Sequence, residues 1–216
     1  PLTDHLPKPL LKVGNKPILE NILDQFIASG FHDFYISTHY KAEMVKKHFE
    51  DGSNWNVSIK YIHEEEPLGT AGGLGLLPSD LPKLPILMMN GDLLTKIDFD
   101  KLLNFHLETG DDATMCVREY DFQVPYGVIK ADGRHIVSIQ EKPIQNFFVN
   151  AGVYVLNQSI LDIVDGVNYL DMPELLEKII KGSGRVNMFP VHEYWLDIGQ
   201  IEQFDKAQQD AIKLFT

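Results

Sequence analysis

The stretch from Pro85 to Asp92, PILMMNGD, constrains the fold of this chain more than any other. Its apolar run is bounded by proline before it and by Asn90-Gly91 after it, which is typical of a strand buried on both faces. The end of such a strand delivers the carboxylate of Asp92 to the edge of a sheet, where ligands of open α/β sheets bind. Taken alone, Asn90-Gly91-Asp92 also fits an ordinary Asx-type turn.

The composition fits one folded domain that binds neither nucleic acid nor a membrane. The 216 residues are 44% hydrophobic and carry a formal net charge of −12, whereas nucleic-acid binding needs a basic surface. The single cysteine, Cys116, excludes an intrachain disulfide and a cysteine-based zinc site. No apolar run approaches the ~20 residues of a membrane span, and no signal peptide is recognisable. We therefore expect a cytoplasmic protein.

Helices and strands alternate through the first half of the chain, which predicts a mainly parallel central sheet flanked by helices. The expected strands are 34–38, 57–63, 85–91 and 113–119, and the expected helices are 18–29, 41–50 and 98–107. The second half is mixed, because Asp132-Gly133 between two strand patterns signals a hairpin of residues 127–131 and 135–140. Further strands are expected at 147–156, 186–191 and 195–198, and helices at 159–164, 173–181 and 201–215. We predict a single α/β domain over residues 1–216.

Two loops have residue types suited to a nucleotide. Lys8 lies between two prolines, which restrict its backbone and suit an ammonium directed at a phosphate. The second loop runs from Glu64 to Gly73, EEEPLGTAGG, where small residues let backbone N–H groups approach an anion or a flat ring. The alternatives are an ordinary exposed lysine and a solvated acidic turn. The glycines of the second loop lack the strand-turn-helix context of a dinucleotide fingerprint, which argues against a nicotinamide-dependent oxidoreductase.

Two aspartates each follow an apolar segment and could share a cation. They are Asp92 and, in the sequence YWLDIG, Asp197. Mg²⁺ usually takes one or two protein carboxylates and completes its coordination with substrate phosphates. The alternative for Asp197 is a cap for the last helix. Farther along the chain, the adjacent Glu141 and Lys142 could hold a hydroxyl and a phosphate, or form a surface ion pair of little energetic weight.

The ordered set of motifs resembles the sugar-1-phosphate nucleotidyltransferase family. The matching segments are LPKPLL, GNKPILE, EEEPLGTAGGL, MNGDLL, YGVI, EKP, NAGVYVL and YWLDIGQIEQF. Each segment alone is weak, but together they span almost the whole chain in the family's order. The resemblance implies a Rossmann-like nucleotidyltransferase fold that joins a nucleoside triphosphate to a sugar 1-phosphate and releases pyrophosphate.

The resemblance also implies roles for individual residues in nucleotide binding. Lys8 matches a lysine that contacts the triphosphate, and Glu64 falls where the family reads the base, with Gly69 and Thr70 beneath that base. A carboxylate only accepts hydrogen bonds, and guanine offers two adjacent donors, so Glu64 favours GTP. UTP, CTP and dTTP remain alternatives.

The implied Mg²⁺ ligands are Asp92 and Asp197, and Asp92 also belongs to the nucleotide site. Lys142 matches the lysine that binds the sugar phosphate. The implied sugar contacts are Gly127, Glu141 and Asn150. We therefore expect Lys8, Asp92, Lys142 and Asp197 to carry catalysis.

One part of the family pattern is incomplete in this sequence. The family's first strand leads into a glycine-rich loop, GxGTRLxPLT, and the chain begins at its last three residues, Pro1-Leu2-Thr3. We expect the missing strand and loop to lie upstream, where a regulatory domain could also lie. A catalytically impaired regulatory subunit of the same fold is the alternative function, and a homo-oligomer is a further expectation.

Overall fold

The computed structural model describes residues 6–214. Pro1-Leu2-Thr3 and the predicted helical position Phe215 lie outside the described residues. The strands are β1 (Lys12–Val13), β2 (Lys16–Pro17), β3 (Asp33–Thr38), β4 (Ser58–His63), β5 (Ile86–Met89), β6 (Leu93–Thr95), β7 (Ala113–Gln123), β8 (Val128–Asp132), β9 (His135–Gln140), β10 (Ile144–Leu156), β11 (Val186–Pro190) and β12 (Trp195–Asp197). The α-helices are α1 (Ile18–Ala28), α2 (Ala42–Phe49), α3 (Gly69–Gly72), α4 (Phe99–Thr109), α5 (Met172–Lys181) and α6 (Ile201–Leu214). Short 3₁₀ helices are η1 (Lys8–Leu10), η2 (Ser53–Trp55), η3 (Gly73–Leu76) and η4 (Gln158–Ile163).

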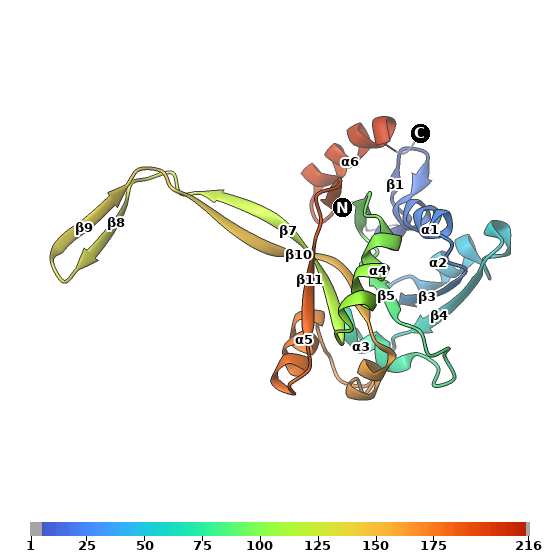
Figure 1. Ribbon diagram of the computed structural model, residues 1–216. Helices are drawn as coiled ribbons and strands as arrows, with labels where there is room; N and C mark the ends of the chain where they lie inside the picture. Colours follow the sequence, from blue (N-terminus) through green and yellow to red (C-terminus); the bar gives the residue numbers. More distant parts are fainter. Residues whose placement is uncertain (1–5, 215–216) are drawn as a thin grey trace.

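A four-stranded sheet in the order β11-β7-β10-β5 forms the centre of the domain (Figure 1). β11 runs parallel to β7, whereas β10 runs antiparallel to both β7 and β5. β3 and β4 form a separate parallel pair. The predicted α/β class is confirmed. The central sheet is less parallel than the alternation of the first half predicts, because β10 comes from the second half and inserts in the opposite direction.

The expected strand at 85–91 is present as β5, but its surroundings differ from the prediction. β5 ends the row of four strands, and all four of its residues are only half-buried. β5 is therefore not buried on both faces within the described part of the chain. Burial on both faces is found instead in the short β6 that follows Asp92 and in the inner half of β10, from Ala151 to Leu156. β6 anchors Asp92 from its C-terminal side.

The helices form where local signals predict them. α4 begins after Asp98, whose carboxylate accepts a hydrogen bond from the N–H of Lys101, and it ends at Gly110 in the left-handed conformation. The amphipathic stripe of α1 turns Ile22 and Phe26 into the core, where Phe26 stacks on Phe99 of α4 at 4.3 Å between ring centroids. No helix in the described part of the chain is long and apolar enough to cross a membrane.

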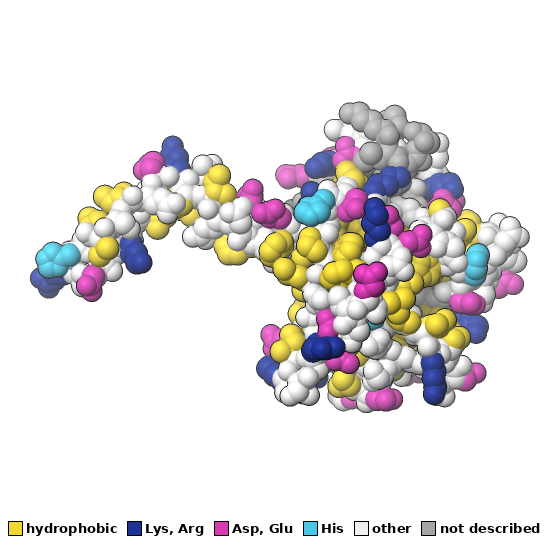
Figure 2. Space-filling view, viewed as in Figure 1, with side chains coloured by type: hydrophobic (Ala, Val, Ile, Leu, Met, Phe, Trp, Pro, Cys, Tyr) yellow, Lys and Arg dark blue, Asp and Glu magenta, His cyan; other side chains and the backbone are white. Residues whose placement is uncertain are grey.

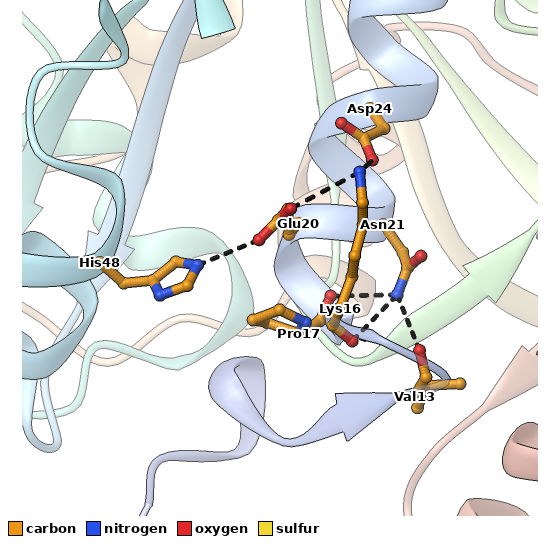
Figure 3. A network of polar contacts seen from close by, with 7 residues as sticks. All are labelled: Val13, Lys16, Pro17, Glu20, Asn21, Asp24 and His48. Atoms are coloured by element: carbon orange, nitrogen blue, oxygen red, sulfur yellow. Dashed lines mark hydrogen bonds and ion pairs between the residues drawn. The ribbon is translucent and has the colours of Figure 1, made fainter. Parts of the chain in front are cut away.

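A buried asparagine fixes the turn between η1 and α1 (Figure 3). The Nδ2 of Asn21 donates to the carbonyl oxygens of Val13, Lys16 and Pro17 at 3.1–3.4 Å. These bonds give the buried side-chain amide of Asn21 its partners, without which its burial would cost free energy. On the exposed side of the same helix, Lys16 pairs with Asp24 at 2.6 Å. The chain that follows η1 is thus tied to the start of α1, where the N–H of Ile18 also donates to the carbonyl oxygen of Leu11 at 2.9 Å.

A long two-stranded arm projects from the body of the domain (Figure 1). Its inner part is the outer half of β7 paired with the first half of β10, and its tip is the β8–β9 hairpin. The hairpin predicted from Asp132-Gly133 is confirmed, and Gly133 takes a positive φ of 58°. We call residues 119–149 the arm.

Candidate active site

Lys8 and Asp92 meet at one edge of the body. The Nζ of Lys8 donates to the Oδ2 of Asp92 at 2.5 Å, and each side chain is about one-third exposed. η1 places Lys8 here, while β5 and β6 place Asp92. Gly91 leaves room for Pro9, whose Cγ would lie 4.0 Å from a Cβ at that position. The two predicted residues are therefore brought together from positions 84 residues apart.

Asp197 joins this pair through the β6–β12 ladder. Asp197 lies opposite Leu93, and the N–H of Ile198 donates to the carbonyl oxygen of Asp92 at 3.0 Å. Partial desolvation raises the pKa of Asp197 above its usual value, the negative charge of Asp92 raises it further, and Lys8 opposes both effects. Two carboxylates thus share one ammonium, which leaves them with an excess of negative charge.

This donor set fits a hard divalent cation. Among residues 6–214 no group of three or more His, Cys, Asp or Glu side chains is placed to hold a metal ion. A site of two carboxylates suits Mg²⁺ when phosphates and water supply the other ligands. A cation between Asp92 and Asp197 would relieve the repulsion that raises the pKa of Asp197.

Hydrogen bonds around Gly152 tie β10 to the strand end that carries Asp92. Gly152 has a φ of 71°, its carbonyl oxygen accepts from the N–H of Asn90 at 2.9 Å, and its N–H donates to the Oδ1 of Asn150 at 2.8 Å. The Nδ2 of Asn150 donates to the hydroxyl of Tyr154. The ladder between β7 and β10 shifts register between Asn150 and Tyr154. This bulge places Gly152 beside the end of β5.

The indole of Trp195 links Asp197 to the same bulge. Its Nε1–H donates to the carbonyl oxygen of Ala151 at 2.8 Å. The guanidinium of Arg118 lies 5.9 Å from the centre of the indole ring and donates to the carbonyl oxygen of Glu193. These contacts hold β12 against β10 two residues before Asp197.

The predicted loop beneath the base is held by α5. The N–H and hydroxyl of Thr70 both donate to the Oδ1 of Asp171, and the hydroxyl of Thr70 accepts from the N–H of Met172 at 2.8 Å. Gly69 has a φ of 77°, and a Cβ there would lie 2.7 Å from the carbonyl oxygen of Leu170. Glycine is therefore required where the loop packs against residues 170–172.

Glu64 braces the turn that precedes this loop. One carboxylate oxygen accepts from the hydroxyl of Ser37, and the other accepts from the N–H of Leu68 at 2.9 Å. A Cβ on Gly73 would lie 3.0 Å from the Oε1 of Glu64, so any residue larger than glycine at position 73 would crowd the carboxylate. Each carboxylate oxygen keeps a further lone pair for a donor.

Three predicted sugar-site residues lie on the arm. A Cβ at Gly127 would lie 3.0 Å from the Oε2 of Glu141, so these two positions adjoin one another. Lys142 follows with a φ of 45° and is exposed. The segment between β9 and β10 that carries Glu141 and Lys142 lies out on the arm, away from the body that carries Lys8, Asp92 and Asp197 (Figure 1). In this conformation the arm residues and the carboxylate pair are separate.

A surface hollow of about 710 Å³ lies elsewhere, between η3, the loop 77–85 and η4. None of the predicted site residues lines it. The hollow is therefore not the site that the motifs predict.

Two residues that the sequence did not indicate, Ser37 and Asp171, support the loop predicted to bind the base. Asp171 is 101 residues from Thr70 and Ser37 is 27 residues from Glu64, so no spacing pattern connects them. Asp171 precedes Met172-Pro173 at the start of α5, a local signal for a helix start and not for a loop contact.

Comparison with known proteins identifies the family of this chain. The sequence pattern of the family described as nucleotidyl transferase matches residues 1–213. The mannose-1-phosphate guanyltransferase of Emericella nidulans is 33% identical over 215 residues, covering 94% of this chain and 58% of that protein. The Pichia angusta protein of the same name is 34% identical over 218 residues, with the same coverage. The chain thus spans about 58% of the length of these curated relatives.

Solved structures show the same fold. HddC from Yersinia pseudotuberculosis superposes with a TM-score of 0.72 at 26% identity, covering 95% of this chain and 90% of that one. The structure of HddC complexed with GMP-PN gives a TM-score of 0.73 at 25% identity, with the same coverage. The family pattern over residues 1–213 and the identity to these relatives show that the chain belongs to the nucleotidyl transferase family.

Proposed function

We propose that this protein joins a nucleoside triphosphate to a sugar 1-phosphate, giving a nucleoside diphospho-sugar and pyrophosphate. The observation that carries the proposal is the grouping of Lys8, Asp92 and Asp197 at one edge of the body. One ammonium and two carboxylates at strand ends suit a triphosphate with its cation. The family match supports the same reaction class.

In this reaction an oxygen of the sugar phosphate attacks the α-phosphorus of the triphosphate. The new P–O bond forms as the bond to the β-phosphate oxygen breaks, and pyrophosphate leaves with the bonding electron pair. The protein contributes positioning and charge stabilisation, and no covalent enzyme intermediate is required. The ammonium of Lys8 would leave Asp92 for a phosphate oxygen of the triphosphate.

Asp92 and Asp197 would hold Mg²⁺. When bound, the cation neutralises charge that develops on the reacting phosphates. The pairing of β6 with β12 fixes the backbone positions from which Asp92 and Asp197 extend before substrate binds. Such preorganised groups need little rearrangement during the reaction.

The sugar phosphate would be bound by Lys142 with Gly127, Glu141 and Asn150. Lys142 is exposed and free to place its ammonium on a phosphate, and Glu141 can accept from sugar hydroxyls. Asn150 lies at the base of the arm, and its side-chain oxygen accepts from the N–H of Gly152, whose carbonyl oxygen accepts from the N–H of Asn90. Movement of the arm residues relative to the body would complete this site.

GTP is the proposed nucleotide. The Glu64 carboxylate accepts two internal hydrogen bonds and keeps lone pairs that suit the adjacent N1–H and 2-amino donors of guanine. Two curated relatives are named as guanyltransferases, and HddC has been solved with GMP-PN.

Pyrophosphate release by the full-length protein tests the proposal. The four common nucleoside triphosphates are crossed with a panel of sugar 1-phosphates in the presence of Mg²⁺. Release with GTP and a hexose or heptose 1-phosphate is expected. Release only with UTP, CTP or dTTP would support the proposed reaction but contradict the proposal that Glu64 selects guanine. Nucleotide binding without any release would overturn the reaction in favour of a regulatory subunit.

A further inference from the structure

Acidic side chains are scattered over the face of the body that Figure 2 shows, but Glu64 differs from its neighbours. Glu65 and Glu66 are exposed, whereas Glu64 is half-buried. Its N–H donates to the carbonyl oxygen of Thr38 at 3.0 Å. Its carbonyl oxygen lies 2.9 Å from the Nδ1 of His39, which must carry the hydrogen because a carbonyl oxygen only accepts. The end of β3 therefore fixes the backbone of Glu64 at both its N–H and its carbonyl group.

Two donors hold the carboxylate of Glu64. The hydroxyl of Ser37 donates to Oε1, and the N–H of Leu68 donates to Oε2 at 2.9 Å. A carboxylate oxygen has two lone pairs, so within the described part of the chain one lone pair on each oxygen stays open. The N1–H and 2-amino groups of guanine are adjacent donors and need two acceptors side by side. With Ser37 and Leu68 bound, Glu64 offers that number of acceptors.

The backbone at Gly73 encloses the same contact. A Cβ there would lie 3.0 Å from the Oε1 of Glu64 and 3.1 Å from the Oγ of Ser37. Gly73 is buried at the start of η3, directly after α3, which contains Gly69 and Thr70. The hydrogen bond between Ser37 and Glu64 therefore lies between β3 and the loop predicted to lie beneath the base.

Ser37 supplies a side-chain donor to this carboxylate, whereas Leu68 supplies a backbone donor. Without the hydroxyl of Ser37, Oε1 would have two open lone pairs, and the carboxylate would be free to turn about its soft terminal torsion. A turned carboxylate no longer matches two adjacent donors. The neighbouring Thr38 has a different partner, because its hydroxyl donates to the carbonyl oxygen of Ile62 at 3.2 Å.

We propose that Ser37 is a positioning residue that sets selectivity for guanine through Glu64. This inference rests on the proposed function, in which Glu64 reads the base. The ligand class that Ser37 selects is a nucleobase with two adjacent N–H donors. Inosine has the N1–H of guanine but lacks the 2-amino group, so ITP measures the loss of one donor. A site built for both donors discriminates against the ligand that lacks one.

Isothermal titration calorimetry of the full-length protein with GTP and with ITP, each with Mg²⁺, tests the proposal. The wild type is compared with Ser37→Ala, the rescue variant Ser37→Thr and the matched control Thr38→Val. The wild type should bind GTP at least about tenfold more tightly than ITP. Ser37→Ala should reduce this ratio to within about threefold, whereas Ser37→Thr and Thr38→Val should keep it. A wild-type ratio in Ser37→Ala, an equal fall in Thr38→Val, or a wild type that binds both nucleotides equally would overturn the proposal.

Glu64→Gln separates this inference from the proposed base reading. The amide keeps one acceptor oxygen and replaces the other with a donor, so the ratio of GTP to ITP affinity should fall to within about threefold. Adding Ser37→Ala to Glu64→Gln should lower the ratio no further, because both changes act on one interaction.

Two outcomes of this cycle distinguish the failures. A lowered ratio in Glu64→Gln beside a wild-type ratio in Ser37→Ala would refute the role of Ser37 and leave the base reading by Glu64 standing. A wild-type ratio in Glu64→Gln would refute both. These titrations contain no sugar phosphate and need no turnover, so they are independent of whether the proposed reaction occurs.

Discussion

Replacing Gly152 by alanine should displace the strand end that carries Asp92. Gly152 has a φ of 71°, and a Cβ there would lie 2.7 Å from the Nδ2 of Asn90 and 3.0 Å from the Cδ1 of Leu93. Leu93 is 1% exposed and has no room to withdraw. The side-chain amide of Asn90 must therefore shift, and Asn90 lies two residues before Asp92.

The magnitude follows from two separable effects. Holding an alanine at positive φ costs roughly 1–2 kcal/mol. Overpacking at a filled site costs a further ~1–3 kcal/mol. Gly110→Ala is the matched control, because Gly110 has a φ of 62° and a Cβ there would meet nothing within 4 Å. The control should lose only the first contribution, so the two variants should differ by ~1–3 kcal/mol.

Urea unfolding and pyrophosphate release measure the two consequences. Gly152→Ala should be less stable than Gly110→Ala, and its kcat/KM should fall at least about tenfold because small misplacements of catalytic groups are costly. Gly110→Ala should keep the wild-type rate. Equal stability of the two variants, with Gly152→Ala at the wild-type rate, would refute the claim that packing around residue 152 sets the position of Asp92.

Three further predictions follow from the contacts. Hydrogen bonds from the N–H of Thr70 and, to a smaller extent, from the hydroxyl of Tyr169 lower the pKa of Asp171 in the folded protein. The ionised carboxylate therefore stabilises the fold above the unfolded-state pKa of ~4, and this stabilisation is lost as pH falls through the folded-state pKa. Asp171→Asn should thus be less stable than wild type at pH ~7, with the difference shrinking below pH ~4 in urea unfolding; a constant difference would contradict this. Trp195→Phe removes the hydrogen-bond donor to the carbonyl oxygen of Ala151 and should lower the unfolding free energy by ~1–2 kcal/mol. It should also lower kcat more than it lowers nucleotide affinity. An unchanged kcat would show that Trp195 does not position Asp197. Lys142→Met should raise KM for the sugar phosphate without shifting the urea midpoint, because Lys142 is exposed; an unchanged KM would remove Lys142 from the site.

Local signals predicted much of the secondary structure. The helix that starts at residue 98 and the hairpin at Asp132-Gly133 each depend on a few neighbouring residues. Such features are encoded where they occur, so their positions can be read from the chain.

The arrangement of strands depends on distant partners and was harder to predict. The apolar run of β5 resembles a strand buried on both faces, but β5 ends the described sheet and is half-buried. The direction of the arm was also missed. Its strands, with Phe147-Phe148 and the alternating apolar residues of β9, have the pattern of core strands although they are exposed.

In the candidate site, too, some residues could be predicted from the sequence, whereas others are identified only by contacts between distant parts of the chain. Lys8, Asp92 and Asp197 were assembled through the family resemblance, and the structure brings them together across 84 residues and one strand pair. Asp171 and Ser37 support the nucleotide loops only through the fold, so the sequence contains no spacing that identifies them. The roles of Gly127, Glu141 and Lys142 stay predictions.

The central claim is that Asp92 and Asp197 together hold the cation for nucleotidyl transfer. The most direct measurement compares the full-length wild type with Asp92→Asn, Asp197→Asn and the control Asp205→Asn, an exposed aspartate on α6. Pyrophosphate release with Mg²⁺ is measured alongside Mn²⁺ binding in the presence of GTP. Each site variant should lose at least ~100-fold in turnover and most of its Mn²⁺ binding, with unfolding free energy near that of the control. Turnover and Mn²⁺ binding in both site variants equal to those of Asp205→Asn would contradict the account.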